Sequence, residues 1–179
     1  MKTNNIEFIE DGHYYLNEDG IIIPSVSQLI KYKFPSAYSG VPDEVLKKKA
    51  SYGTRTHEAI ERFIKGEYTL EELKKKNIDP NIKVAVEQFE LLRKTWAFQI
   101  KEIEQIVSWN GKYAGTFDLL TLDDYLIDIK TTSELHMDWL QWQLSLYAMA
   151  KNLKHDFHFC MWFPKGKMGK VVQVNGLPL

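Results

Sequence analysis

Two aspartates and one lysine interrupt segments that otherwise have the pattern of buried strands. Asp128 and Lys130 stand within the apolar run 125–131, and because side chains alternate along a strand they share one face of it. Asp118 stands in a second such segment, 113–121. A buried carboxylate without a partner is costly, so each needs a lysine or a metal ion nearby. The pattern predicts a site for a hard divalent cation, where the lysine orients or deprotonates a metal-bound water. The alternative is a structural ion pair between aspartate and lysine, or an edge strand.

The two aspartates can share an ion only if they lie opposite each other on neighbouring strands. A plain two-residue turn at Asp123 and Asp124 would pair Asp118 with Ile129 and place Asp118 and Asp128 on opposite faces. We therefore predict a loop with an odd number of residues, or a β-bulge, between the two segments.

Two further polar pairs have helical spacing. His57 and Glu61 lie one turn apart, as do Gln143 and Tyr147. His57 could be a metal ligand or a phosphate contact, and the amide and phenol could hold a DNA backbone or the lysine. The alternatives are a polar helix face for the first pair and a core tyrosine with an incidental glutamine for the second.

A further acid could come from the segment 99–109. Glu104 is a candidate accessory residue, but the alternation of apolar residues is loose there and Glu102 competes with it. A solvent-exposed role is the favoured interpretation of both from the sequence.

The charge of the chain is nearly balanced, at −1 overall, but its distribution is uneven. Residues 45–56 and 164–170 carry basic side chains without any acid. These local patches are compatible with a phosphate-backbone partner, and the alternative is two solvated surfaces. Their basic residues are Lys47, Lys48, Lys49, Arg55, Lys165, Lys167 and Lys170.

The composition favours one soluble globular domain. The 179 residues are 44% hydrophobic and 26% charged, which excludes a mostly disordered chain. The single Cys160 excludes an internal disulfide framework, a cysteine-only zinc site and a four-cysteine iron–sulfur cluster. No apolar run is long enough to cross a membrane, and the start MKTNNIEFIEDG lacks the apolar stretch of a secretory signal. We expect a cytoplasmic protein that does not bind membranes.

The expected fold is a mixed α/β or α+β domain with one central sheet flanked by helices. Residues 1–41 form an N-terminal appendage, a hairpin over 5–23, a helix from Ser25 to Ile30 and a loop over 33–41, and residues 42–179 form the core. We predict a helical stretch from 42 that is interrupted near Gly53 and stops at Gly66, and a short helix capped by Thr69 and Glu72. The remaining predicted elements are a helix over 80–98, strands over 99–109, 113–121 and 125–131, a helix over 137–152, and strands over 156–163 and 170–174.

The motifs, taken in order, resemble those of the PD-(D/E)XK nucleases, specifically the RecB-like and phage-type exonuclease branch. That branch has four elements: a helical Gly-Thr-x-x-His-x-x-x-Glu, a strand with Gly-x-x-Asp, Asp-x-Lys-Thr, and Gln-x-x-x-Tyr. Phe117 stands where the proline of the superfamily name would be, and the four cysteines of the iron–sulfur members are missing. The residues that match are Gly53, Thr54, His57, Glu61, Gly115, Asp118, Asp128, Lys130, Thr131, Gln143 and Tyr147.

The resemblance implies a restriction-endonuclease-like core and hydrolysis of phosphodiester bonds with one or two Mg²⁺ or Mn²⁺ ions and no iron–sulfur cluster. Asp118, Asp128 and His57, with the carbonyl of Ile129, would hold the metal. Lys130 would position the attacking water, and Gln143 and Tyr147 would fix the strand as part of the catalytic set. Glu61 and Glu104 remain accessory candidates. The residues expected to contact DNA are Lys47, Lys48, Lys49, Arg55 and, by stacking on an unpaired base, Tyr52.

The implied function is a phage-type exonuclease acting on single- or double-stranded DNA in recombination, repair or replication. It would work in the cytoplasm of a bacterium or a phage-infected host, with a recombination or replication protein as a possible partner and a homo-oligomer as a possible assembly. Two alternatives stay open: a structure-specific or restriction-type endonuclease of the same fold, and a catalytically inactive DNA-binding or assembly module.

Overall fold

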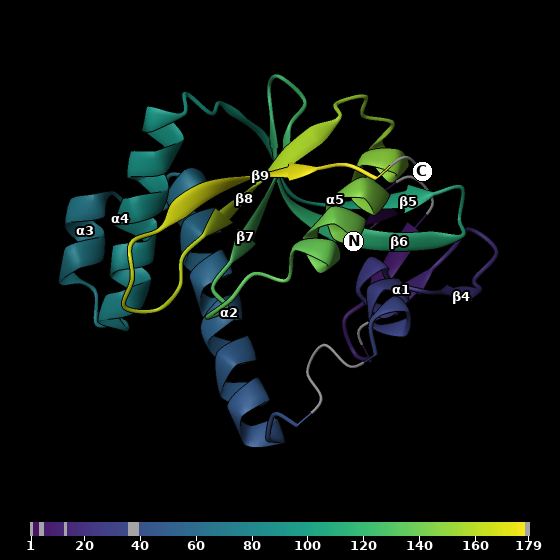
Figure 1. Ribbon diagram of the computed structural model, residues 1–179, viewed down its shortest axis with the longest axis horizontal. Coiled ribbons are helices and arrows are strands. Elements are labelled where there is room, and N and C mark those ends of the chain that lie inside the picture. The colour runs from purple at the N-terminus through teal and green to yellow at the C-terminus, as the bar shows by residue number, and fades with distance from the viewer. Residues whose placement is uncertain (1, 4–5, 13, 36–39, 178–179) are drawn as a thin grey trace.

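The chain folds into helices and two β-sheets, one of them with five strands, as a mixed α+β structure (Figure 1). The computed structural model describes residues 2–3, 6–12, 14–35 and 40–177. The predicted hairpin at 5–23 and loop at 33–41 therefore fall partly outside the described residues.

The N-terminal segment forms a small antiparallel sheet rather than a single hairpin. Its order is β1-β2-β3-β4, with β1 Lys2–Thr3, β2 Ile6–Ile9, β3 Tyr14–Leu16 and β4 Ile22–Ile23. The predicted turn after β3 is present, since the Gly20 N–H donates to the Asn17 carbonyl at 3.0 Å. The sheet packs on the larger one, where the Tyr15 hydroxyl lies 3.1 Å from Thr116 Oγ1.

The larger sheet has the order β5-β6-β7-β8-β9. β5, β6 and β7 form an antiparallel meander, β7 pairs in parallel with β8, and β8 pairs antiparallel with β9. A parallel neighbour requires a crossover, which is a helix here. The strand bounds are β5 Ile100–Trp109, β6 Tyr113–Thr121, β7 Leu126–Lys130, β8 Phe157–Trp162 and β9 Lys170–Asn175.

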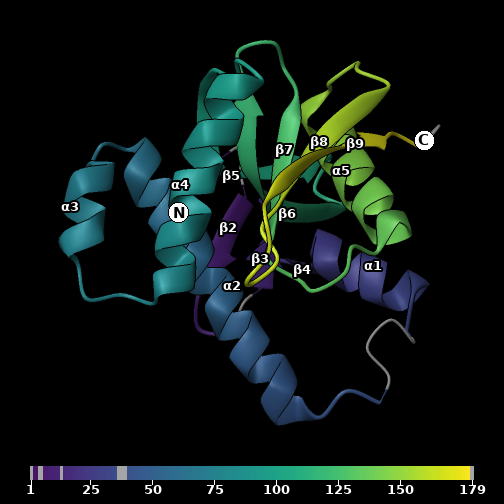
Figure 2. The same ribbon diagram turned by 60° about the vertical axis from the view of Figure 1, so that its left-hand side comes forward.

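Helices cover both faces of this sheet, with α4 and α5 on opposite sides (Figure 2). Leu126 packs in the apolar cluster formed with α1 and α5, whereas Ile127 and Ile129 pack in the cluster formed with α2 and α4. The alternation predicted for β7 is therefore confirmed. The helix bounds are α1 Val26–Lys33, α2 Asp43–Ile64, α3 Leu70–Lys75, α4 Pro80–Thr95 and α5 Met137–Lys151.

The helix starts follow local sequence signals more closely than the ends. Thr69 and Glu72 form the capping box that the sequence predicts, and Ser25 forms a second complete box with Gln28. The predicted interruption near Gly53 is wrong, because α2 runs unbroken for 22 residues. α4 ends at Thr95 rather than at Phe98. Ala97 takes a positive φ of 54°, and the chain then turns into β5.

Within the described residues, no helix is both long and apolar enough to cross a membrane.

Candidate active site

The loop between β6 and β7 places the two aspartates opposite each other. Leu119 pairs with Ile127, and the Thr121 N–H donates to the Tyr125 carbonyl at 2.9 Å. The loop therefore has three residues, 122–124, with Asp124 in the left-handed region at φ 61°. This confirms the odd loop that a shared site requires, and continuing the register sets Asp118 against Asp128.

The backbone ladder ends just before the aspartates, and a side chain takes its place. The Ile129 N–H donates to Asp118 Oδ2 at 2.6 Å. This hydrogen bond ties the carboxylate of β6 to the backbone of β7. The carbonyl of Ile129 as a metal ligand stays a prediction.

Asp128 and Lys130 form a buried ion pair on the face of β7 that carries Leu126. Lys130 Nζ donates to Asp128 Oδ1 at 2.8 Å and lies 2.6 Å from Oδ2, with the Asp128 side chain only 3% exposed. The second oxygen, Oδ2, has no hydrogen bond of good geometry among the described residues. A metal ion that bound Oδ2 would have to share this oxygen with the Lys130 ammonium.

Two further ligand-type groups lie close to Asp118. His57 Nδ1 from α2 lies 3.5 Å from Asp118 Oδ1 and 3.9 Å from Glu104 Oε1 of β5. The ligand atoms of His57, Glu104 and Asp118 all lie within 4.8 Å of one another. His57 and Glu104 are partly open to solvent, with side chains 27% and 32% exposed.

Glu104 belongs to this cluster, although the sequence favoured an exposed role for it. Its backbone is in the left-handed region at φ 47°, and the β5–β6 register shifts between Ile100 and Glu102. Glu102 instead pairs with Lys151 on α5, at 2.7 Å. This irregular backbone explains the loose alternation of apolar residues in the sequence. Because of it, the sequence did not indicate which of the two glutamates reaches the site.

The helix pair Gln143 and Tyr147 lies beside the aspartates. Tyr147 is buried, Gln143 hydrogen-bonds its phenol, and Asp118 and Asp128 add to burial in raising the pKa of Tyr147 well above its ordinary value. Its ring crosses closely over β6, since a Cβ at Gly115 would lie 2.8 Å from Tyr147 Cε1. This contact explains the glycine three residues before Asp118.

Other matched residues fix the position of α2. A Cβ at Gly53 would lie 3.3 Å from Thr131 Oγ1, so the helix approaches the end of β7 closely at this point. Glu61 points its carboxylate to Lys65, with 2.5 Å between Oε1 and Nζ, and it adds to burial in raising the pKa of Glu104.

The basic residues expected to contact DNA lie on the exposed surface of α2. Lys47, Lys48, Lys49 and Arg55 are all exposed, and the N-terminal half of α2 projects from the body of the protein in both views (Figures 1 and 2). Lys49 reaches the loop after β7, where its Nζ lies 3.5 Å from Ser133 Oγ.

The ionisable groups of the site strongly perturb one another. Burial opposes protonation of His57, but Asp118 and Glu104 outweigh it and raise its pKa to about 10. Burial also opposes ionisation of Asp118, yet His57, Lys130 and the Ile129 N–H hold its pKa below the ordinary value. Burial raises the pKa of Asp128 to about 6, despite Lys130, and nearby Asp118 adds to the rise. Three acids thus share two cations, which leaves excess negative charge.

The carboxylates of this donor set fit a hard divalent ion. Carboxylate oxygens suit Mg²⁺ or Mn²⁺, whereas an imidazole is more typical of transition-metal sites, and ligand atoms about 3 to 4 Å apart match an octahedron with bonds of about 2.1 Å. The 3.5 Å separation of His57 Nδ1 and Asp118 Oδ1 lies in this range. Metal binding would displace the proton that His57 carries, so affinity should fall as pH falls.

Comparison with known proteins gives no identity. No family model matches the chain, and the curated proteins contain no match. Among solved structures, "Crystal structure of SSO0001" is similar over 84% of this chain and 76% of that one, at 16% identity and a TM-score of 0.35. A TM-score this low supports no conclusion about fold or function.

Proposed function

We propose that this protein is a metal-dependent deoxyribonuclease with a restriction-endonuclease-like core, of the RecB-like branch that lacks an iron–sulfur cluster. The observation that carries the proposal is the register that sets Asp118 against Asp128, with the Lys130 ammonium 2.8 Å from the Asp128 carboxylate. The order of the motifs along the chain supports it. The substrate is DNA and the reaction is hydrolysis of its phosphodiester bonds.

Asp118, Asp128 and His57 would hold one or two Mg²⁺ or Mn²⁺ ions, with Glu104 as an additional ligand. When bound, the metal supplies Lewis-acid stabilisation of the charge that develops on the phosphate and the leaving oxygen.

The residues of the chain itself do the positioning. Asp128 holds the Lys130 ammonium in place. The ammonium orients the attacking water by donating a hydrogen bond to its oxygen. Tyr147, aligned by Gln143, holds the backbone of the strand in register. The exposed lysines of α2 contribute contacts to phosphates that do not depend on sequence.

The motif order resembles that of the phage-type exonucleases, and the form of the DNA substrate distinguishes an exonuclease from an endonuclease. An exonuclease degrades linear DNA and leaves covalently closed circular DNA intact. Cleavage of the closed circle would assign endonuclease activity to the same site.

The test measures cleavage of end-labelled single- and double-stranded DNA with Mg²⁺, with Mn²⁺ and with EDTA. We expect EDTA to abolish cleavage, added metal to restore it, and Asp128→Asn to reduce it to background. Asp123→Asn is the matched control, because Asp123 is exposed in the β6–β7 loop, and it should cleave as the wild type does. Cleavage that resists the chelator, or an Asp128→Asn variant with full activity, would refute the proposal.

A further inference from the structure

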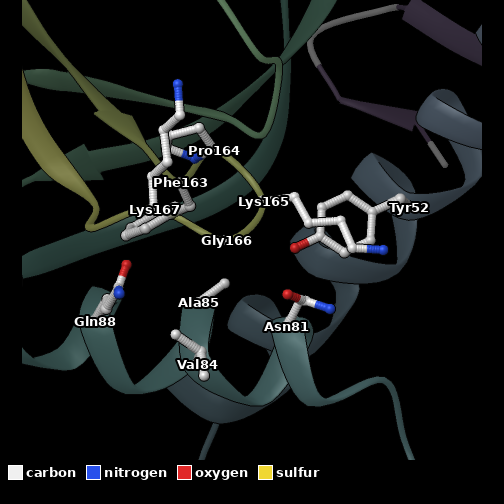
Figure 3. Close-up of a pocket in the computed structure, with 10 residues that line it drawn as sticks. All are labelled: Tyr52, Asn81, Val84, Ala85, Gln88, Phe163, Pro164, Lys165, Gly166 and Lys167. Carbon is white, nitrogen blue, oxygen red and sulfur yellow. The ribbon is translucent and has the colours of Figure 1, made fainter.

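A cavity of about 270 Å³ lies between α2, α4 and the loop that joins β8 to β9 (Figure 3). It is separate from the metal-ligand cluster. Its wall contains Phe163 and Ala85, which belong to the apolar core between the sheet and the helices α2 and α4. Both sites take a residue from α2, since Tyr52 borders the cavity and His57 belongs to the metal-ligand cluster.

The cavity combines an aromatic ring with two cations. Tyr52 of α2 forms one side, and Lys165 and Lys167 come from the β8–β9 loop. Lys165 Nζ lies 5.5 Å from the centroid of the Tyr52 ring. This face of the ring is therefore covered by a flexible lysine side chain. Figure 3 shows Lys165 across the Tyr52 ring.

The loop that carries the lysines is anchored to α4. The Gly169 N–H donates to Gln88 Oε1 at 2.7 Å, and a Cβ at Gly169 would lie 2.6 Å from the Phe163 ring. The two lysines are thus presented from a fixed backbone. Lysines on an anchored loop beside an apolar wall suit a ligand with a phosphate on one side and a flat apolar body on the other.

The electrostatics favour an anion. No acid is among the described residues that line the cavity. Asp79 adds to burial in raising the pKa of Tyr52, and its carboxylate accepts hydrogen bonds from the Asn81 backbone and side chain at 2.9 Å each. A second cavity of the protein provides the contrast: it also has a lysine over a tyrosine, Lys76 over Tyr68 at 5.3 Å, but Glu67 and Glu72 line it.

We propose that the cavity between α2, α4 and the β8–β9 loop binds one unpaired nucleotide of a single-stranded DNA substrate, with the base on Tyr52 and the phosphate on Lys165 and Lys167. A base stacks on an aromatic ring more strongly than an exposed lysine does, so the base displaces Lys165 from the ring and Lys165 turns to the phosphate. The inference rests on the proposed nuclease function for its choice of substrate.

The test measures binding without cleavage. The fluorescence anisotropy of a short labelled oligo-dT is followed in EDTA with the full-length protein. We expect Tyr52→Leu to weaken binding about tenfold or more, and Tyr52→Phe, which keeps the ring, to bind as the wild type does. Replacing both Lys165 and Lys167 by Gln should lower the slope of log affinity against log salt by about 0.7 for each lysine. Lys76→Gln is the matched control and should change nothing.

A free nucleotide and a nucleotide within a strand offer the same chemistry, and competition separates them. Unlabelled oligo-dT should displace the probe at far lower concentration than dTMP, and equal competition would contradict a strand as the ligand. Unchanged affinity in both Tyr52→Leu and the double lysine variant would overturn the proposal. Because cleavage is not measured, this failure would leave the nuclease proposal standing, and loss of nuclease activity in every condition would leave the binding result standing.

Discussion

At the scale of single residues, the central question is why a strand in the middle of the sheet buries Asp128. Its side chain is 3% exposed, and Lys130 neutralises it from the same face of β7. Buried ion pairs are often no more stabilising than apolar residues of similar size, so stability alone does not account for this one. A role for Lys130 in positioning the attacking water would explain why Asp128 and Lys130 are present at this place in the sheet.

Lys130→Ala should slow DNA cleavage by about 100- to 10,000-fold, which is the range for loss of a group that assists proton transfer. DNA binding should be retained, since the ammonium is engaged with Asp128 rather than exposed for phosphates. Single-turnover cleavage and anisotropy in EDTA measure the two effects. Lys101→Ala, which removes an exposed ion pair with Asp124 at 3.0 Å, should preserve both. Wild-type turnover in Lys130→Ala would remove the lysine from the mechanism.

Glu104 and Glu102 provide a matched pair on one strand. Glu104→Gln removes a carboxylate within 3.9 Å of His57, so the Mg²⁺ concentration for half-maximal cleavage should rise about 10- to 100-fold. Glu102→Gln removes only the ion pair with Lys151, and the metal requirement should stay that of the wild type. A metal titration of cleavage compares the two. Equal requirements in both variants would show that Glu104 is not a ligand.

At the scale of elements, the sequence indicated most helices and strands because their signals are local. Capping boxes at Ser25 and Thr69, and the Asn110-Gly111 turn between β5 and β6, depend only on neighbouring residues. Gly53 misled the prediction because a glycine weakens a helix locally, whereas this one is explained by Thr131, far away in the sequence.

Parts of the candidate site depended equally on distant contacts. The opposition of Asp118 and Asp128 could be predicted, since it follows from the parity of one loop. The position of Glu104 could not, because a positive φ within β5 sets it. The cavity beside Tyr52 was also hidden, since it needs α2, α4 and the β8–β9 loop together.

Gly115→Ala tests the close crossing of α5 over β6. The added methyl would meet Tyr147 at 2.8 Å and Val26 at 3.1 Å, and overpacking of this kind destabilises by about 1–3 kcal/mol. Gly53→Ala is the comparison: its methyl meets a single hydroxyl at 3.3 Å, and the gain in helix propensity of up to about 1 kcal/mol opposes the strain. Urea unfolding should show a clear loss for Gly115→Ala and a change within about 1 kcal/mol for Gly53→Ala. Equal stabilities would mean that α5 yields at this contact.

At the scale of the whole molecule, the five-stranded sheet lies between two apolar clusters, and the charged site lies where β6 and β7 run side by side. His158 of β8 is a buried titratable residue outside the candidate site. Its Nδ1 accepts a hydrogen bond from the Leu126 N–H at 3.1 Å, and it is 1% exposed. Burial, together with nearby His155, lowers the pKa of His158 to about 4.

His158 should make the protein sensitive to acid. The unfolded chain binds a proton near pH 6.5 and the folded chain only near pH 4, so its contribution is complete above pH 6.5 and is lost as the pH falls toward 4. The loss corresponds to about 3 kcal/mol. His158→Asn keeps an acceptor for Leu126 and cannot titrate, so its unfolding free energy should fall less than that of the wild type over this interval. Parallel curves for the two proteins would contradict a neutral buried imidazole.

The whole account depends on a divalent ion in contact with both β6 and β7. Anomalous diffraction from crystals soaked in Mn²⁺ measures this directly. We predict a peak in contact with the carboxylates of Asp118 and Asp128, with His57 as a further ligand, and no peak there in Asp118→Asn. Manganese that binds elsewhere, or a site that stays without metal while Lys130 remains paired with Asp128, would contradict the account.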